Sequence, residues 1–176
     1  MKNTCEVFPG RFVVVFLRTK KDGPQKAMLI DECDLERTLA LGYSIFACGQ
    51  KKTRKPCAAF HETVDGKQKT IWFHRWLMDA PAGVLVDHLN GNTLDNRRTN
   101  LRLATNVQNN LNIHGATGRS RSGIRGVSPY GKSGKYRARI GIGNRTVCLG
   151  TFRNIEDARR AFNEKLHEID PLARTA

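Results

Sequence analysis

Apolar residues gather in short runs over the first fifty positions, which predicts a mostly β segment. The run at 12–17 is almost continuously apolar and predicts a strand that is covered on both faces. Further strands are expected at 27–30 and 43–48. Asp31 can cap a short helix that stops at Gly42, because aspartate favours the position before a helix and glycine the position after it.

The pattern at 57–73 predicts a β-hairpin. Two strand-like runs flank Asp65 and Gly66, and Asp-Gly is a favoured two-residue hairpin turn. The second run leads into a short helix at 74–78, which Pro81 would stop. The large apolar residues around this helix are expected to be core: Trp72, Phe73, Trp76, Leu77 and Met78.

Apolar and polar residues alternate at 135–142, as in a strand with one buried face. The apolar positions are Tyr136, Ala138, Ile140 and Ile142, and the alternate positions are Lys135, Arg137, Arg139 and Gly141. Gly143 and Asn144 predict a tight turn into another strand, in which Val147 and Leu149 would face the core.

A helix is predicted after Asn154, which can cap it. Its apolar positions keep helical spacing and are Ile155, Ala158, Phe162, Leu166 and Ile169. The region 124–170 is therefore expected to be a module of three strands and one helix. The helix would cover the apolar face and leave the basic face for a partner, although a solubilising charged surface is the alternative.

The charge of the chain changes this picture, because it indicates a polyanionic partner. The formal net charge is +14, and residues 96–155 contain twelve Lys or Arg and no Asp or Glu. Contacts of such side chains with phosphates supply most nonspecific DNA affinity. Residues 113–123 are rich in Gly, Ser and basic side chains, so we expect a linker that lies along DNA or is disordered without it.

Two classes of protein are disfavoured. The sequence has neither an apolar run of transmembrane length nor a secretory signal pattern, so a cytoplasmic protein without a membrane segment is expected. Five cysteines lack any Cys-x-x-Cys pair, which argues against a disulfide framework and a structural zinc site. We expect most of them to be buried free thiols.

Residues 84–112 carry the candidate chemistry. Asp87 and His88 end a short apolar run, Asn100 follows His88 by twelve residues, and Asn109 follows Asn100 by nine. A strand, a loop, a second strand and a helix would bring these side chains together. Asp87 and Asn109 could supply oxygen ligands to a hard divalent cation. His88 would point to the opposite face of its strand from Asp87 and could act as a general base.

This stretch resembles the HNH nucleases of phage and intron-encoded homing endonucleases. The resemblance rests on VDHLNGNTLDNRRTNLR, on the following ATNVQNN, and on both spacings. It implies that His88 activates water, that Asp87 and Asn109 bind the metal, and that Asn100 holds the loop and orients the histidine. The metal would be Mg²⁺, with Mn²⁺ as the alternative.

Three further residues match the pattern of this family. Asn96 matches it, but a structural role in the loop is the preferred interpretation. His74 and Arg75 match a His-Arg pair that often precedes the HNH core. For His74 we prefer a packing role over a place in the active site, and Arg75 is a candidate phosphate contact.

The module at 124–170 resembles the Apetala-type (ethylene-response-factor) DNA-binding domain. The matching stretches are IRGV at 124–127, GKYRARI at 134–140, VCLGTF at 147–152 and EDARRAF at 156–162. That family lays its sheet in the DNA major groove, which admits a narrow β-ribbon. Cys148 and Arg139 depart from the family pattern, so base preference does not transfer. The candidate DNA contacts of the whole chain are Arg75, Arg119, Arg121, Arg125, Arg137, Arg139 and Arg145.

Together these patterns predict an α+β protein with five parts. These are a β-rich segment at 1–70 that packs on the nuclease, an HNH core of ββα-metal type at 71–112, a basic linker at 113–123, the DNA-binding module at 124–170 and a tail at 171–176. The predicted function is a metal-dependent, site-preferring endonuclease of the homing type, encoded by a phage or mobile element. It would act on double-stranded DNA and leave 5′-phosphate and 3′-hydroxyl ends. A monomer would nick one strand, and a dimer could form on DNA.

Two alternatives remain. One is a DNA-binding regulator whose HNH unit is inactive, although the complete set of Asp87, His88, Asn100 and Asn109 argues against it. The other is an RNA-binding protein. Aromatic residues make up only 7% of the chain and Tyr136 falls on the apolar side of its strand, so the sequence lacks an obvious stacking face for single strands.

Overall fold

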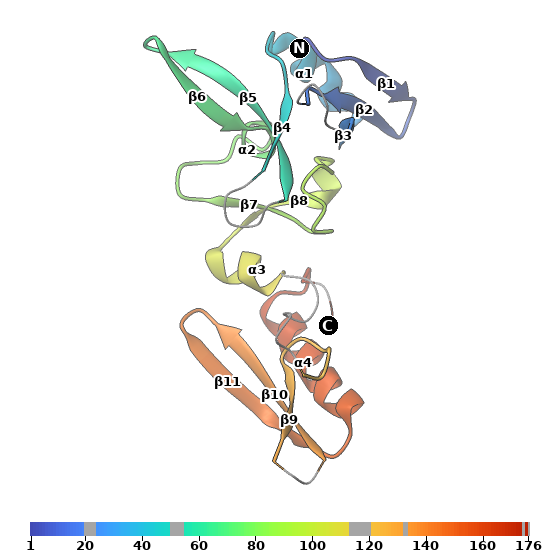
Figure 1. Cartoon of the computed structure of the whole chain (residues 1–176), viewed down its shortest axis with the longest axis vertical. Helices are drawn as coiled ribbons and strands as arrows, with labels where there is room; N and C mark the ends of the chain where they lie inside the picture. The colour runs from blue at the N-terminus through green and yellow to red at the C-terminus, as the bar shows by residue number, and fades with distance from the viewer. Residues whose placement is uncertain (20–23, 50–54, 113–120, 132–133, 174, 176) are drawn as a thin grey trace. The chain divides into compact units, whose positions relative to one another are not determined.

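The computed structural model of the chain describes residues 1–19, 24–49, 55–112, 121–131, 134–173 and 175 (Figure 1). These residues form several small antiparallel sheets together with a few helices, which confirms the α+β class. The chain divides into two compact units, Met1–Leu103 and Ala104–Ala176.

The first sheet of the first unit has the order β1-β2-β3, with β1 at Cys5–Phe8, β2 at Phe12–Leu17 and β3 at Lys26–Ile30. The strands expected at 12–17 and 27–30 are confirmed, whereas β1 was not predicted. Inward residues of β2 such as Val13 and Val15 are fully buried, and the residues between them are half-buried. The expectation of two covered faces is therefore correct for one face only.

The short helical segment after β3 begins differently from the prediction. It consists of a 3₁₀ turn, η1 (Glu32–Asp34), followed by α1 (Leu35–Ala40), and Gly42 follows with a positive φ. The prediction that Asp31 caps this helix is wrong, because its side chain makes no capping hydrogen bond. Its carboxylate accepts instead from the backbone N–H of Arg98, a residue far along the chain.

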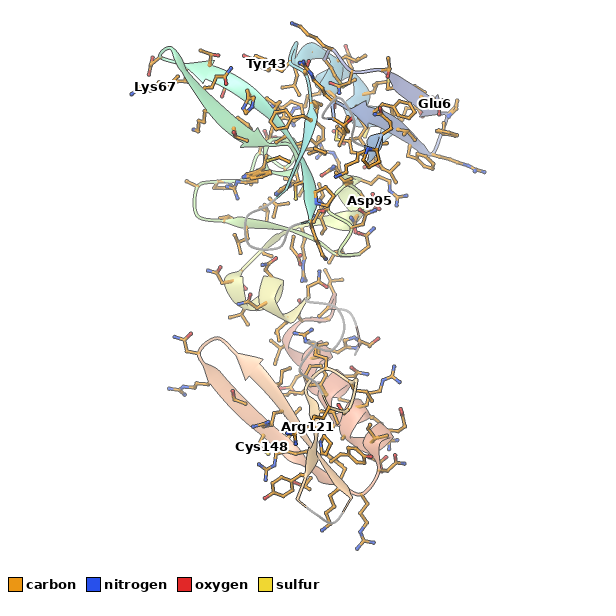
Figure 2. The ribbon with its side chains drawn as sticks, viewed as in Figure 1. Glu6, Tyr43, Lys67, Asp95, Arg121 and Cys148 are labelled. Atoms are coloured by element: carbon orange, nitrogen blue, oxygen red, sulfur yellow. The ribbon has the colours of Figure 1, made fainter. Side chains whose placement is uncertain are left out.

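The second sheet has the order β4-β5-β6, with β4 at Phe46–Gly49, β5 at Pro56–Val64 and β6 at Lys67–Trp72. Asp65 and Gly66 both have positive φ, as a two-residue type I′ hairpin requires, so the predicted turn is confirmed. Figure 2 shows Lys67 at the tip of this hairpin. β6 leads directly into α2 (Phe73–Leu77), the predicted short helix.

A single apolar core joins both sheets to the segment that contains the candidate site. That segment holds β7 (Leu85–His88), the 3₁₀ turn η2 (Arg98–Asn100) and β8 (Leu101–Ala104), and β7 pairs with β8. The core contains residues of β2, β3 and β5, Phe73 and Leu77 of α2, and Leu101 of β8. A pair of four-residue strands is too small to bury a core of its own, so the first seventy residues supply its apolar cover.

The second unit contains α3 (Asn106–Leu111), β9 (Val127–Tyr130), β10 (Lys135–Ile142), β11 (Arg145–Phe152) and α4 (Ile155–Ile169). The sheet has the order β11-β10-β9, and α4 packs against it (Figure 1). Asn154 accepts a hydrogen bond from the N–H of Glu156, so the predicted cap is confirmed. The predicted set of three strands and one helix is confirmed as well.

Two details of this unit differ from the expectation or extend it. Leu149 packs against the core, but Val147 is 37% exposed, because β11 is an edge strand with a neighbour on one side only. The prediction for Val147 is therefore wrong. Leu111 of α3 is buried against Ile140, Phe162 and Leu166, so α3 contributes to the core of the second unit.

Candidate active site

Asp87 and His88 are the last two residues of β7, and both side chains are buried. Neighbouring residues of a strand face opposite sides, and these two have different partners. Asp87 pairs with Arg102 on β8, whereas His88 contacts Asn96 and His74. The strand end therefore presents a carboxylate and an imidazole in separate surroundings.

The imidazole of His88 is held by Asn96. Nε2 of His88 lies 3.3 Å from Oδ1 of Asn96, which is fully buried. The amide nitrogen of Asn96 donates to the carbonyl of Leu94 and to the sulfur of Met28, and these bonds fix the direction of its oxygen. Because an amide oxygen only accepts, this contact is a hydrogen bond when Nε2 of His88 carries the proton, and in that tautomer Nδ1 carries the lone pair.

The surroundings of His88 favour its neutral form. Burial lowers the pKa of His88 below its ordinary value, while the hydrogen bond with Asn96 and the charges of Asp87 and Asp95 oppose this shift without cancelling it. A general base must be unprotonated to accept a proton from water. His88 therefore has the protonation state that a base requires at neutral pH.

His74 lies beside His88. The ring centroids of the two imidazoles are 5.1 Å apart at an angle of 68°, and His74 is buried at the start of α2. Burial lowers the pKa of His74 to about 3, with further lowering by His88 and Arg75. Its Nδ1 is buried and has no hydrogen-bond partner among the described residues. His74 thus has the buried position expected of a packing residue and also contacts the predicted base.

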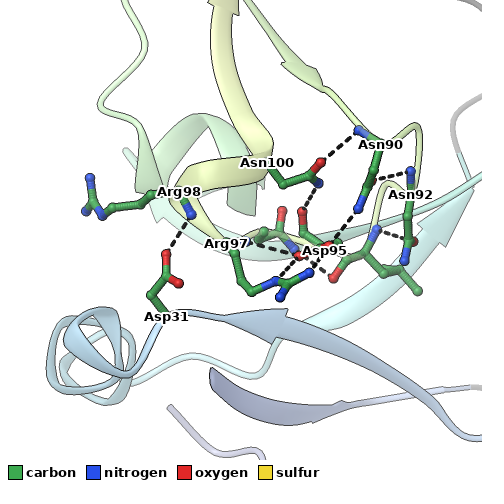
Figure 3. Close-up of polar contacts among 9 residues, drawn as sticks. Asp31, Asn90, Asn92, Asp95, Arg97, Arg98 and Asn100 are labelled. Carbon is green, nitrogen blue, oxygen red and sulfur yellow. Dashed lines mark hydrogen bonds and ion pairs between the residues drawn. The ribbon is translucent and has the colours of Figure 1, made fainter. Parts of the chain in front are cut away.

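The loop between β7 and β8 is held by asparagine and aspartate side chains (Figure 3). Oδ1 of Asn100 accepts from the N–H of Asn90 at 2.8 Å, and its Nδ2 donates to the carbonyl of Asp95 at 2.7 Å. Asp95 accepts from Nδ2 of Asn90 and from the guanidinium of Arg97. Asn100 therefore ties both parts of the loop together, while the side-chain contact with His88 described above comes from Asn96.

Asp95 was not singled out in the sequence, yet it is the centre of this network. Its side chain is buried, and burial alone would raise its pKa, but the Arg97 guanidinium and Asn90 bond to the carboxylate and lower the pKa below its ordinary value. The sequence signal was available, because Asp95 stands inside the same LDNRR stretch as Asn96. A charged residue at position 95 is equally compatible with a turn exposed to solvent, so the sequence alone does not identify Asp95 as a buried carboxylate with several hydrogen-bond partners.

The N-terminal segment anchors the loop from the other side. The N–H of Leu29 on β3 donates to the carbonyl of Leu94, and the N–H of Asn96 donates to the carbonyl of Leu29. Arg98 forms an ion pair with Asp34 of η1, with a shortest distance of 2.6 Å. These contacts join the loop to the β1-β2-β3 sheet and so place Asn96 against His88.

The predicted phosphate contact at Arg75 has intramolecular partners. Its guanidinium donates to the backbone carbonyls of Val84, Ala80 and Pro81. It thereby closes the turn that connects α2 to β7. A DNA contact by Arg75 stays a prediction, and the structure gives this side chain a role in holding β7.

The other candidate DNA contacts belong to the second unit or fall outside the described residues. Arg119 lies outside them, and Arg121, Arg139 and Arg145 are exposed. Arg137 is half-buried, with its guanidinium carbon 3.4 Å from the centre of the Tyr130 ring. Arg125 is half-buried and donates to the carbonyls of Leu111 and Asn110, at the end of α3.

The predicted metal ligands lie in different units. Asp87 belongs to the first, and Asn109 lies on α3 in the second. Within the described part of the chain, no group of three or more His, Cys, Asp or Glu side chains converges as a metal cluster would.

The described cysteines are all free thiols, but only Cys57 is buried, so the expectation that most are buried is wrong.

Comparisons with known proteins agree with the chemistry of this segment. A model of the HNH endonuclease family matches residues 79–111, which include Asp87, His88, Asn96, Asn100 and Asn109. The comparison with curated proteins finds no match, and neither does the comparison with solved structures. In the described residues no helix is long and apolar enough to cross a bilayer. The family match supports a nuclease that acts on DNA.

Proposed function

We propose that the protein is a metal-dependent, site-preferring endonuclease of the homing type that cleaves double-stranded DNA. The observation that carries this proposal is the contact between His88 and Asn96 at the end of a buried strand. A histidine held in this way, in a segment that matches the HNH endonuclease model, is suited to act as a general base, which supports the proposal.

The chemistry assigned to the chain's own residues is proton transfer and positioning. Nδ1 of His88 would accept a proton from the water that attacks the phosphorus atom. Asn96 would keep the ring in place, and Asn100 would keep the loop closed while the phosphate is bound. Cleavage of the bond between phosphorus and the 3′ oxygen would leave 5′-phosphate and 3′-hydroxyl ends.

A divalent ion, Mg²⁺ or Mn²⁺, fits the donor set that the resemblance assigns. Asp87 offers a carboxylate and Asn109 an amide oxygen, and these are hard ligands of the kind that such ions take together with water or phosphate oxygens. When bound, the ion supplies stabilisation of the charge that develops on the phosphate and the leaving oxygen.

The second unit is proposed to select the DNA site. Arg139 is exposed on the face of the sheet that α4 does not cover, and Arg145 is exposed at the first position of β11, beside the turn. Arg137 packs against the ring of Tyr130 in the same sheet. Basic side chains on a narrow antiparallel sheet suit the DNA major groove. The homing type is proposed because this module and an HNH segment occur in one chain.

Conversion of supercoiled plasmid to open-circle and linear forms tests the proposal. The assay needs lanes with Mg²⁺, with Mn²⁺ and with a chelator, and it needs the His88→Ala protein in parallel. We expect metal-dependent cutting by the native protein and a loss of about 10²-fold or more in the variant, because a general base contributes at least that much. Arg37→Gln is a suitable control, since Arg37 pairs with Asp79 and neither residue belongs to the loop that holds His88.

The plasmid should be one that contains a site selected by the protein from a random duplex library. Duplex binding without cutting in any metal would contradict the nuclease and would support the alternative, a DNA-binding regulator. An open-circle product that accumulates before the linear form would indicate one nick per active site.

A further inference from the structure

Arg102 and Asp87 form an ion pair in which both side chains are largely buried. Nε and Nη2 of Arg102 lie 3.2 Å and 3.0 Å from the same carboxylate oxygen, Oδ2 of Asp87. The side chains of Arg102 and Asp87 are only 10% and 9% exposed. The two residues stand on the neighbouring strands β8 and β7, so the backbone holds them together.

This enclosure distinguishes the pair from the other arginine ion pairs of the first unit's described residues. In those pairs the arginine side chain is 35% to 46% exposed, and the pairs are Arg37–Asp79, Arg97–Asp95 and Arg98–Asp34. Removing a guanidinium from water costs free energy that an ion pair often does not recover. An apolar pair at these two strand positions would cover the site equally well, which points to a functional reason for the charge.

The partner of Arg102 is the carboxylate that is assigned as a metal ligand. A Mg²⁺ ion lies about 2.0–2.1 Å from each ligand oxygen. A guanidinium held on the same oxygen would repel the ion, and repulsion is strong where water is largely excluded. The free protein therefore presents Asp87 with its charge already compensated.

We propose that Arg102 is the resident counter-ion of Asp87 in the DNA-free protein, and that it leaves Asp87 for a DNA phosphate when DNA and metal bind. This inference rests on the proposed function. A guanidinium is suited to the exchange, because its planar fork matches carboxylate and phosphate oxygens alike. Metal binding would then be weak without DNA and tight with it, so that the protein holds its metal mainly on the substrate.

Calorimetric titration of the DNA-free protein with Mn²⁺ tests the first half of the proposal. Arg102→Gln removes the charge and keeps a hydrogen-bond donor for Asp87, whereas Arg102→Lys keeps the charge. We expect Arg102→Gln to bind Mn²⁺ about tenfold more tightly than the native protein, because a like charge has been removed beside the ion. Arg102→Lys should remain near the native value.

Arg37→Gln is the matched control, since it removes an arginine from another carboxylate of the same unit, Asp79, which lies outside the active-site loop. It should leave the Mn²⁺ affinity unchanged. Equal, measurable affinities in the native protein and in Arg102→Gln would overturn the role of Arg102 while leaving the proposed function intact. No Mn²⁺ binding by any of these proteins, with or without duplex DNA, would overturn the proposed function and this inference with it.

The effect of DNA on Mn²⁺ affinity tests the second half of the proposal, the release of Asp87 by Arg102. This measurement begins with a protein that keeps Arg102, so it does not rely only on a variant in which the loss of Arg102 can also disturb the fold. In the His88→Ala protein, which keeps Asp87 and Arg102, Mn²⁺ affinity can be measured with and without a mixed-sequence duplex. We expect the duplex to raise the affinity about tenfold or more, within the usual range of coupling between two sites. The gain should be much smaller when Arg102→Gln is added. An equal gain in both proteins would overturn the proposed exchange.

Discussion

The ring of His74 stands edge-on to the ring of His88, with centroids 5.1 Å apart and an angle of 68° between the planes. Both side chains are buried, and burial lowers the pKa of each. A positive charge on one ring would also disfavour a positive charge on the other. The pair is therefore held neutral, which preserves the lone pair on His88 that the proposed chemistry uses.

The pKa of His74 predicts how stability depends on pH. The ordinary value is 6.5 and the value in the folded protein is about 3, so between these values the unfolded chain binds a proton that the folded protein excludes. Stability must then fall as the pH falls through this window. We expect the His74 contribution to the free energy of unfolding to drop by about 2 kcal/mol from pH 7.5 to pH 5.

Urea unfolding of the native protein and of His74→Gln at these two pH values measures the effect. The variant is expected to be less stable at pH 7.5 and to lose less stability on acidification. The relevant quantity is the difference between the two pH dependences, because other groups titrate in both proteins. Parallel pH dependences would show that His74 is protonated in the folded state and would contradict the prediction.

Asn96 is expected to matter for catalysis through His88. Asn96→Ala removes the oxygen that faces Nε2 of His88, so the ring loses the bond that sets its orientation and tautomer. We expect the cleavage rate to fall about tenfold to a hundredfold, less than for His88→Ala, with little change in duplex affinity. The measurement is single-turnover cleavage together with a binding titration.

Asn92→Ala is a suitable comparison for that variant. Asn92 belongs to the same loop but is exposed, and its side chain accepts only a local bond from the N–H of Leu94 among the contacts described. It should retain a rate near that of the native protein. A similar loss in both variants would indicate general damage to the loop instead of a specific effect on the histidine.

The sequence pattern placed Asp87 and His88 at a strand end, because they close a short apolar run that polar residues follow. It did not identify the contact between Asn96 and His88. That contact depends on the path of the loop, which backbone bonds between Leu29 and the loop determine. Such long-range pairing leaves no local periodicity, and for the same reason the true partner of Asp31 was missed.

Gly126 is part of the IRGV stretch on which the sequence resemblance of the second unit rests. Only the structure shows why a glycine is needed at this position. Its φ is +72°, and a Cβ atom there would lie 2.2 Å from the Phe162 ring and 2.7 Å from the carbonyl oxygen of Arg139. We expect Gly126→Ala to destabilise the second unit by about 3 kcal/mol or more, through backbone strain and overpacking together.

Gly134→Ala separates these two causes. Gly134 also has a positive φ, +65°, but a Cβ atom would meet nothing within 4 Å. Its cost should be only that of the left-handed backbone, about 1–2 kcal/mol. Hydrogen exchange is the measurement, and Gly126→Ala should lose protection in β10 and α4 while β2 and β5 keep theirs. Equal costs for the two variants would refute the close approach of Gly126 to Phe162.

The arginines of the second unit divide by their partners, and this division predicts two different phenotypes. Arg139 and Arg145 are exposed, whereas Arg125 donates to the carbonyls of Leu111 and Asn110 and lies 5.7 Å from the centre of the Phe162 ring. Burial lowers the pKa of Arg125, as expected of a guanidinium that packs inside the unit. The sequence resemblance grouped it with the DNA contacts because a motif does not report the direction of a side chain.

Arg139→Ala and Arg145→Ala should each weaken duplex binding and reduce the slope of log affinity against log salt by about 1, because each removes one phosphate neutralisation. Arg125→Ala should instead lower the stability of the second unit by about 2 kcal/mol, since the carbonyls at the end of α3 lose their donor. Fluorescence anisotropy at several salt concentrations and thermal unfolding distinguish the two effects. An unchanged salt slope for both exposed arginines would show that DNA does not contact this side of the sheet. A reduced slope with unchanged stability in Arg125→Ala would return Arg125 to the DNA surface.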